Sequence, residues 1–99
     1  METITKPAMT VAQVGDKFKV FKVTGSRGAE MPSHISTKEA VVVVQYGEAI
    51  LTLQGKEIHL KTNDSAIIPA QAPHTLLIEE DFESYVIMGN DSEIQFTNQ

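Results

Sequence analysis

The stretch that decides the fold is "AVVVVQY", residues 40–46, in which four valines follow one another. A valine loses rotamer freedom in a helix, whereas its branched Cβ packs well on a pleated sheet. Ser36 and Glu39 precede the run with the spacing of a capping box, a signal that opens helices. The four valines outweigh that signal and predict a strand. Because apolar side chains point to both of its faces, the strand is expected to be covered on both sides.

Strand patterns continue on either side of this stretch. Charged and apolar side chains largely alternate over residues 17–23, which predicts a strand with one wet face. Residues 49–60 predict two strands around a turn at Gln54-Gly55-Lys56. Three further short strands are expected at residues 66–69, 74–80 and 83–88, the last two separated by an acidic corner. Short strands broken every 8 to 12 residues or so by Gly, Pro and Asn-Asp predict an all-β sandwich or barrel.

The length and charge of the chain exclude several classes of function. A chain of 99 residues is expected to form one domain, residues 1–99. The net charge is -5 and only eight residues are Lys or Arg, so neither a nucleic-acid partner nor a membrane-binding segment is expected. There is no cysteine, which excludes disulfides and thiolate metal sites. With no apolar run of signal-peptide or membrane-span length, a cytoplasmic location is expected.

Two groups of spaced residues carry a resemblance to a known family. The first is Gly28, His34, Ser36, Ala40 and Gly47. Their spacing resembles the first motif of the cupins, in which the five positions hold Gly, His, His, Glu and Gly. Cupins are antiparallel jelly-roll barrels, also called double-stranded β-helices, and the His and Glu of this motif usually bind a metal. The spacing is retained here, but Ser36 and Ala40 replace two of the three metal ligands.

The second group is Asn63, Pro69, Gln71, His74 and Ile78. The second cupin motif has Gly, Pro, Gly, His and Asn at these positions, so the Pro and the His are retained and three residues are changed. The resemblance implies that residues 1–99 form a single antiparallel jelly-roll barrel of the cupin type. It also implies that His34 and His74 face the barrel interior.

The remaining ligands decide whether a resident metal is expected. Catalytic zinc and non-haem iron usually have three or more protein ligands, and a serine hydroxyl is a poor ligand for a divalent ion. Glu39 is one residue from the position of the lost carboxylate, but alternation along a strand sends its side chain to the outer face. We therefore expect no metal cofactor. The alternative is Zn, Fe, Mn or Ni held by His34, His74 and Glu39, if a bulge turns Glu39 inward.

A cavity that binds an organic ligand fits these residues better. A few polar groups on apolar walls are typical of small-molecule sites. The polar groups would be His34, Ser36 and His74, and a sugar-like molecule or an organic acid is the expected ligand. Two alternatives stay open: an isomerase or dioxygenase-like enzyme that uses His34 and His74, and a ligand-free structural barrel. The expected apolar lining consists of Val42, Val44, Leu51 and Leu76.

One surface is expected to bind a partner. Val41, Val43 and Ile50 should lie on the outer face of their strands, where they form an apolar strip. Strips of this kind usually mark protein interfaces. We expect a homodimer in which this face packs against its symmetry mate. His59, between two inward apolar residues, should instead be exposed to solvent.

Overall fold

The computed structural model describes residues 5–97, which form eight antiparallel strands and contain no helix. Within this range there is accordingly no helix long and apolar enough to cross a membrane. The strands are β1 Ala8–Val14, β2 Phe18–Gly25, β3 Glu30–Ser36, β4 Ala40–Leu53, β5 Lys56–Lys61, β6 Ser65–Ile68, β7 His74–Gly89 and β8 Ile94–Phe96.

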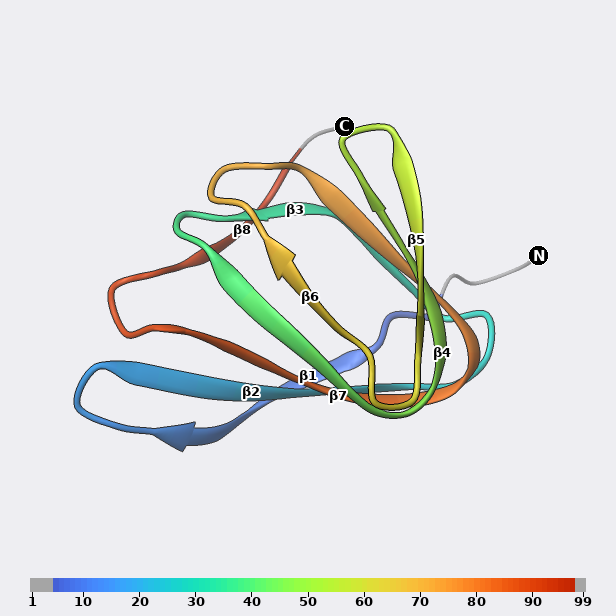
Figure 1. Cartoon of the computed structure of the whole chain (residues 1–99), viewed down its shortest axis with the longest axis horizontal. Helices are drawn as coiled ribbons and strands as arrows, with labels where there is room; N and C mark the ends of the chain where they lie inside the picture. The colour runs from blue at the N-terminus through green and yellow to red at the C-terminus, as the bar shows by residue number, and fades with distance from the viewer. Residues whose placement is uncertain (1–4, 98–99) are drawn as a thin grey trace.

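Two long strands, β4 and β7, organise the fold. They pair with each other along almost their whole length, from Ala40 opposite Met88 to Leu53 opposite His74. Both bend sharply near the middle, so that the paired strands run out along one side of the molecule and return along the other (Figure 1). The four-valine segment is the first half of β4, as its composition predicts.

The bend divides the strands into two facing layers. The first layer has the order β1-β2-β7-β4-β6 and uses the second half of β7 and the first half of β4. The second layer has the order β8-β3-β7-β4-β5 and uses the other halves. The hydrophobic core lies between them. This arrangement confirms the predicted all-β antiparallel jelly-roll barrel.

Gly47 lies at the bend of β4, where it has a φ of +90°. A Cβ at this position would lie 2.1 Å from the carbonyl oxygen of Asp81 and 2.7 Å from the Cα of Phe82. Only a glycine combines this φ with so close an approach of a second backbone. The Phe82 side chain is 1 % exposed and fills the inside of the bend.

The prediction of separate short strands around this bend is wrong. Residues 74–80 and 83–88 belong to one strand, β7, and the acidic corner is a bend inside it. β4 likewise continues through Gly47. The register between β4 and β7 shifts three times between Val44 and Ala49. Such bulges let paired strands bend without ending, so turn-forming residues here mark a kink.

Alternation along the first half of β4 places its side chains as predicted. Ala40, Val42 and Val44 are 6 % exposed or less and face the core. Val41 and Val43 are only half-buried, on the outer face of the first layer. The expectation that the strand is covered on both sides is therefore wrong for this chain alone. A cross-strand row continues the apolar surface through Ile67, Val41, Ile87 and Val20.

The β4–β5 hairpin follows the sequence closely. Its turn consists of Gln54 and Gly55, both with positive φ, and the apolar residues of the two strands share one buried face. His59 is exposed, as expected. By contrast, β1, β3 and β8 are not predicted by the sequence pattern, because β1 is almost fully exposed, β3 contains Pro32 and β8 has three residues.

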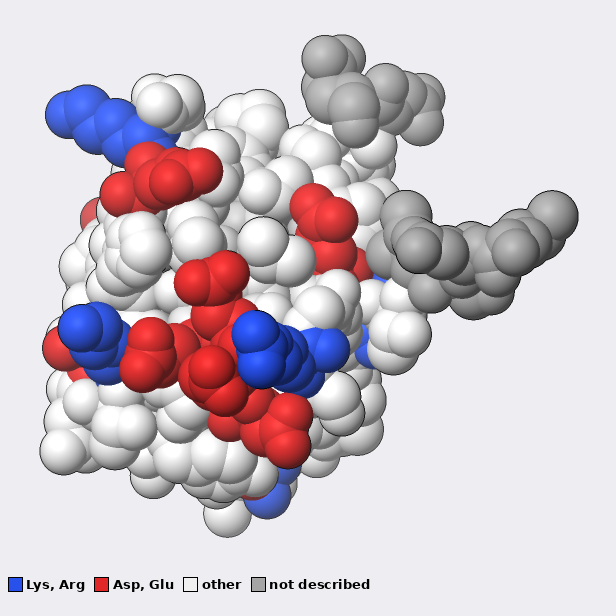
Figure 2. Space-filling view, turned by 90° about the vertical axis from the view of Figure 1, so that its right-hand side faces the viewer, with Lys and Arg blue, Asp and Glu red and all other residues white. Residues whose placement is uncertain are grey.

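Charged side chains gather on the face where the long strands bend. Figure 2 shows acidic side chains across the middle of this face, with basic ones beside them. Glu48 lies directly opposite Glu80 on one side and Lys61 on the other. Asp81 accepts a hydrogen bond from the backbone nitrogen of Arg27 at 3.1 Å. These charged side chains are exposed on the outside of the bend, and no Lys, Arg, Asp or Glu side chain is buried within residues 5–97.

Candidate functional site

A cavity of about 50 Å³ lies between the two layers. Its walls are mostly apolar, and its polar side chains are two histidines and two serines. The first layer contributes Met9, Val23, Ala40, Val42, Ile68, Ser84, Val86 and Met88, and the second contributes Met31, His34, Ser36, Leu51, Leu60, His74, Leu76 and Ile94.

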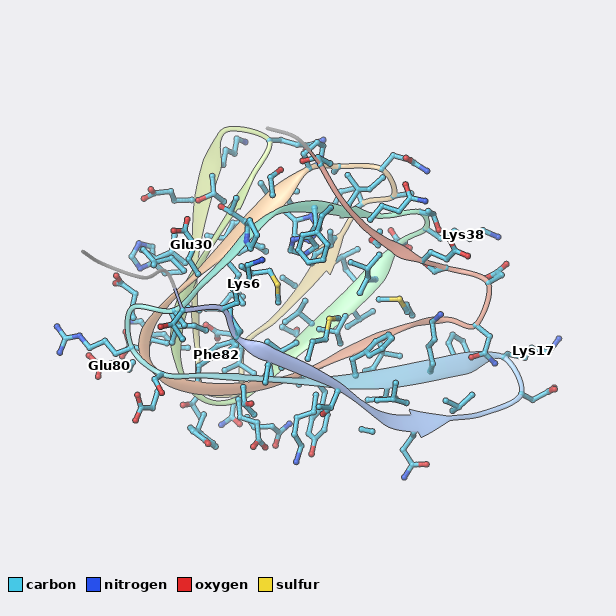
Figure 3. The ribbon with its side chains drawn as sticks, turned by 180° about the vertical axis from the view of Figure 1, so that it is seen from behind. Lys6, Lys17, Glu30, Lys38, Glu80 and Phe82 are labelled. Carbon is cyan, nitrogen blue, oxygen red and sulfur yellow. The ribbon has the colours of Figure 1, made fainter. Side chains whose placement is uncertain are left out.

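The loop between β7 and β8 is tied to the end of the barrel opposite the bend. Ser92 is fully buried in this loop, and its hydroxyl accepts a hydrogen bond from the backbone nitrogen of Lys38 at 3.2 Å. The Nζ of Lys19 donates to the Ser92 carbonyl at 2.7 Å. Figure 3 shows Lys17 and Lys38 at this end and Phe82 at the other. The cavity lies between these two ends.

The two histidines meet because a bulge in β3 adjusts the strand alternation. Met31 pairs with Leu76, and His34 pairs with His74, so three residues on β3 span two on β7. The extra residue keeps both Met31 and His34 on the inward face. The imidazole centroids of His34 and His74 are 4.1 Å apart, at an interplanar angle of 61°.

Each imidazole is held by the backbone carbonyl two residues before it. His34 Nδ1 lies 2.7 Å from the Pro32 oxygen, and His74 Nδ1 lies 2.8 Å from the Ala72 oxygen. A carbonyl can only accept, so Nδ1 carries the proton in both rings. In the neutral imidazoles Nε2 therefore has a free lone pair.

The surroundings keep both rings neutral near neutral pH. Burial is the largest cause that lowers the pKa of His34, and the neighbouring His74 lowers it further, while the bond to Pro32 acts in the opposite direction. Burial likewise lowers the pKa of His74 against the effect of its bond to Ala72. The site therefore offers two hydrogen-bond acceptors, or two metal ligands, and no positive charge.

Two serine hydroxyls complete the polar part of the cavity. Ser36 is 3 % exposed and Ser84 is 1 % exposed, and neither hydroxyl has a hydrogen-bond partner among the described residues. Ser84 was missed by the sequence reasoning. The signal that would have found it is the alternation of β7, which places Ser84, Val86 and Met88 on one face.

The structure brings together most of the residues predicted to line the cavity. The six that do so are His34, Ser36, Val42, Leu51, His74 and Leu76. Val44 does not line it. Val44 also faces inward, but it lies one step nearer the bend, where its backbone bonds Asn63 and Asp64, and it packs in the core.

The described residues do not fit a hard divalent metal ion. Glu39 is exposed, at the end of the loop before β4, and does not turn inward. Ala40 lines the cavity without offering a donor atom. No group of three or more His, Cys, Asp or Glu side chains is placed to hold a metal within residues 5–97. Two imidazoles and two hydroxyls are fewer strong ligands than such ions take in catalytic sites.

Comparison with known proteins agrees with this architecture. The fold is shared with a protein of Klebsiella pneumoniae subsp. pneumoniae MGH 78578 described as having a double-stranded beta-helix domain, at a TM-score of 0.83 and 21% identity, over 100% of this chain and 90% of that one. The class is thus a double-stranded β-helix with a histidine pair inside. The family model described as "Cupin domain" matches residues 21–88, and the chain belongs to the cupin family.

Two of the similar proteins that have names referring to an activity are dioxygenases. Quercetin 2,3-dioxygenase of Bacillus subtilis (strain 168) is 33% identical over 81 residues, which cover 77% of this chain and 24% of that protein. Salicylate 1,2-dioxygenase of Pseudoaminobacter salicylatoxidans, in adducts with gentisate, has a TM-score of 0.74 at 15% identity, over 84% of this chain and 25% of that one. This chain spans about a quarter of the length of each.

Proposed function

We propose that this cupin binds one small, neutral, hydroxylated molecule, of the size of a diol, inside its barrel. The observation that carries the proposal is the pair of buried hydroxyls, Ser36 and Ser84, which face the same cavity as the histidines and have no hydrogen-bond partner. Buried polar side chains in native proteins nearly always have one. A ligand that bonds both hydroxyls would supply it.

The chemistry of the four groups selects the ligand. The Nε2 atoms of His34 and His74 accept hydrogen bonds, so the ligand needs O–H donors. The hydroxyls of Ser36 and Ser84 can donate to its oxygen atoms. No charged side chain lines the cavity, so a carboxylate would lose its hydration without gaining a partner of opposite charge. A neutral alcohol or diol therefore fits better than an ionised organic acid.

The volume limits the size of the ligand. A cavity of about 50 Å³ is small, which favours a ligand of a few non-hydrogen atoms. Pockets for drug-sized ligands measure roughly 300 Å³ or more. The sequence predicts a sugar-like molecule or an organic acid, and the small volume favours a fragment of the first kind, with vicinal hydroxyls, such as propane-1,2-diol.

Calorimetric titration and thermal unfolding with propane-1,2-diol, glucose and acetate test the proposal. The diol should bind with a millimolar dissociation constant, about -4 kcal/mol, and raise the melting temperature. Glucose and acetate should not. Ser36→Ala and Ser84→Ala should each weaken diol binding by about fivefold, the equivalent of one hydrogen bond. Ser65→Ala, which removes an exposed hydroxyl on β6, is the matched control. Equal binding by all four proteins would contradict the proposal.

A dioxygenase activity is the second candidate, favoured by the 33% identity to the Bacillus relative. The missing ligands at Ser36 and Ala40 weigh against it. Oxygen uptake with quercetin, measured after incubation of the protein with iron or copper, tests this candidate. Turnover that is lost when His34 or His74 is replaced by alanine would favour the enzyme over the binding protein.

A further inference from the structure

The edge strands of the two layers differ in how well they are protected from pairing with another chain. The edges are β1 and β6 in the first layer, and β5 and β8 in the second. Native proteins protect sheet edges with short strands, charged side chains or proline, because unpaired backbone groups otherwise bond to a further strand. β6 has four residues, β8 has three, and β5 has charged side chains at Lys56, Glu57 and Lys61. These three edges are therefore protected.

β1 lacks these protective features. Its seven residues, Ala8–Val14, include no charged residue, proline or glycine. Among the described residues β1 pairs with β2 alone, so the backbone N–H and C=O groups along its other edge have no partner strand. A bulge at Ala12 interrupts the register, but Ala8–Val11 are regularly paired. Val11 and Val14 are 61 % and 66 % exposed, so this edge is also apolar.

β1 also borders a groove of about 710 Å³ on the outer face of the first layer. Residues 10–13 form one wall of the groove, and outer-face residues of β2, β4 and β7, among them Val43, form the rest. The lining includes no Asp or Glu, and its one charged residue is Lys22, although the chain has 13 acidic residues and a net charge of -5. An acidic chain repels its own copy, so contact between two copies is least opposed where carboxylates are missing.

We propose that the free edge of β1 pairs antiparallel with β1 of a second copy, so that the first layers of two barrels join into one sheet around a two-fold axis. The two identical strands are uncharged and meet without like charges opposite each other. Because β1 borders the groove, the paired copy lies next to the outer face that holds Val43. The proposal assigns the hydrogen-bonded part of the expected homodimer to a strand that the sequence pattern does not predict.

The two-fold axis identifies one residue that the pairing brings close to its own copy. Antiparallel overlap of the full seven residues places the middle one, Val11, near Val11 of the second copy. The Val11 side chain is largely exposed in a single chain, so a charge at this position leaves the barrel interior unchanged. Two charges of the same sign here oppose the pairing, whereas charges of opposite sign favour it.

Sedimentation equilibrium of Val11→Lys, of Val11→Glu and of their equimolar mixture tests the proposal. Each variant alone should have its dimer dissociation constant raised about fivefold or more relative to the parent protein. In the mixture, the heterodimer should be tighter than either variant homodimer by about fivefold or more. His59→Lys is the matched control, because it adds a charge at an exposed position of the edge strand β5 and should dimerise like the parent.

Amide hydrogen exchange of the parent protein at high and low concentration separates edge pairing from contact through side chains alone. Amides along β1 should exchange more slowly at the concentration where the dimer forms, because pairing bonds their N–H groups. A monomeric parent at micromolar concentration, an unchanged dissociation constant in Val11→Lys, no preference for the heterodimer, or concentration-independent exchange of β1 would each overturn the proposal. None of these measurements depends on diol binding, so failure of the proposed function would leave this proposal standing, and the reverse.

Discussion

Replacing Gly47 with alanine should be among the most destabilising single substitutions in this protein. Two costs add at this position. The first is conformational: a non-glycine residue at a φ of +90° lowers the free energy of unfolding by about 1–2 kcal/mol. The second is steric: the new Cβ would lie 2.1 Å from the Asp81 carbonyl oxygen, so β7 must move and Phe82 must repack. Overpacking of this kind costs about 1–3 kcal/mol.

The two costs sum to about 2–5 kcal/mol, a large part of the 5–15 kcal/mol that stabilises a typical domain. The structure offers matched controls. Gly55 and Gly28 also have positive φ, of +78° and +90°, but a Cβ at either would meet nothing within 4 Å. Gly55→Ala and Gly28→Ala should therefore show only the conformational cost of about 1–2 kcal/mol.

Urea unfolding of the three variants and the parent at one temperature gives these free energies by linear extrapolation. The difference between Gly47→Ala and Gly55→Ala isolates the steric cost at the bend. If both variants lose the same free energy, the close approach of β4 and β7 at Gly47 is not a packing constraint, and the reasoning is refuted.

Three further predictions concern the cavity and the outer face. Folding lowers the pKa values of His34 and His74, so the unfolded chain binds more protons below the ordinary value of 6.5. The free energy of unfolding should therefore fall as the pH drops below 6.5. Above pH 6.5 it should not depend on these two groups. Urea midpoints across this range measure the effect, and a His34→Phe, His74→Phe variant should show a flatter profile. Ser84→Ala should leave the unfolding free energy of the ligand-free protein unchanged or raise it by up to about 1 kcal/mol, because it removes a buried hydroxyl with no partner among the described residues. A clear decrease of the unfolding free energy in chemical denaturation would show that the hydroxyl is hydrogen-bonded. We also propose that the outer face of the first layer, which includes Val41 and Val43, packs against a second copy of the chain. Val43→Lys should then yield a monomer in sedimentation experiments, and a monomeric parent at micromolar concentration would remove this proposal.

The sequence was informative where a property depends on neighbours along the chain. The valines of residues 40–46, the turn at Gln54 and Gly55 and the exposed position of His59 follow from local propensity and a period of two. Glu39 is exposed as predicted, but it lies in the loop before β4, so alternation along the strand does not set its position. These predictions needed no knowledge of which strands pair.

The strand ends predicted from the sequence are wrong where turn-forming residues lie inside a strand. Gly47 and the acidic corner before Phe82 have the composition of loops, yet both lie inside long strands. A bulge and a loop use the same residues, since both need positive φ or exposed polar side chains. Whether the chain kinks or ends depends on the strand across from it, which lies 30 or more residues away.

The amino-acid sequence by itself determined that this protein is a β barrel, which histidines face its interior and which ligands of the cupin motifs are missing. The tertiary structure alone decided that Ser84, Met31 and Met88 share a cavity with those histidines, that Val44 does not, and that the cavity is small. The physical reason is that side-chain alternation is set within each strand, whereas contacts across the cavity depend on bulges, register and the bend that brings the two layers together.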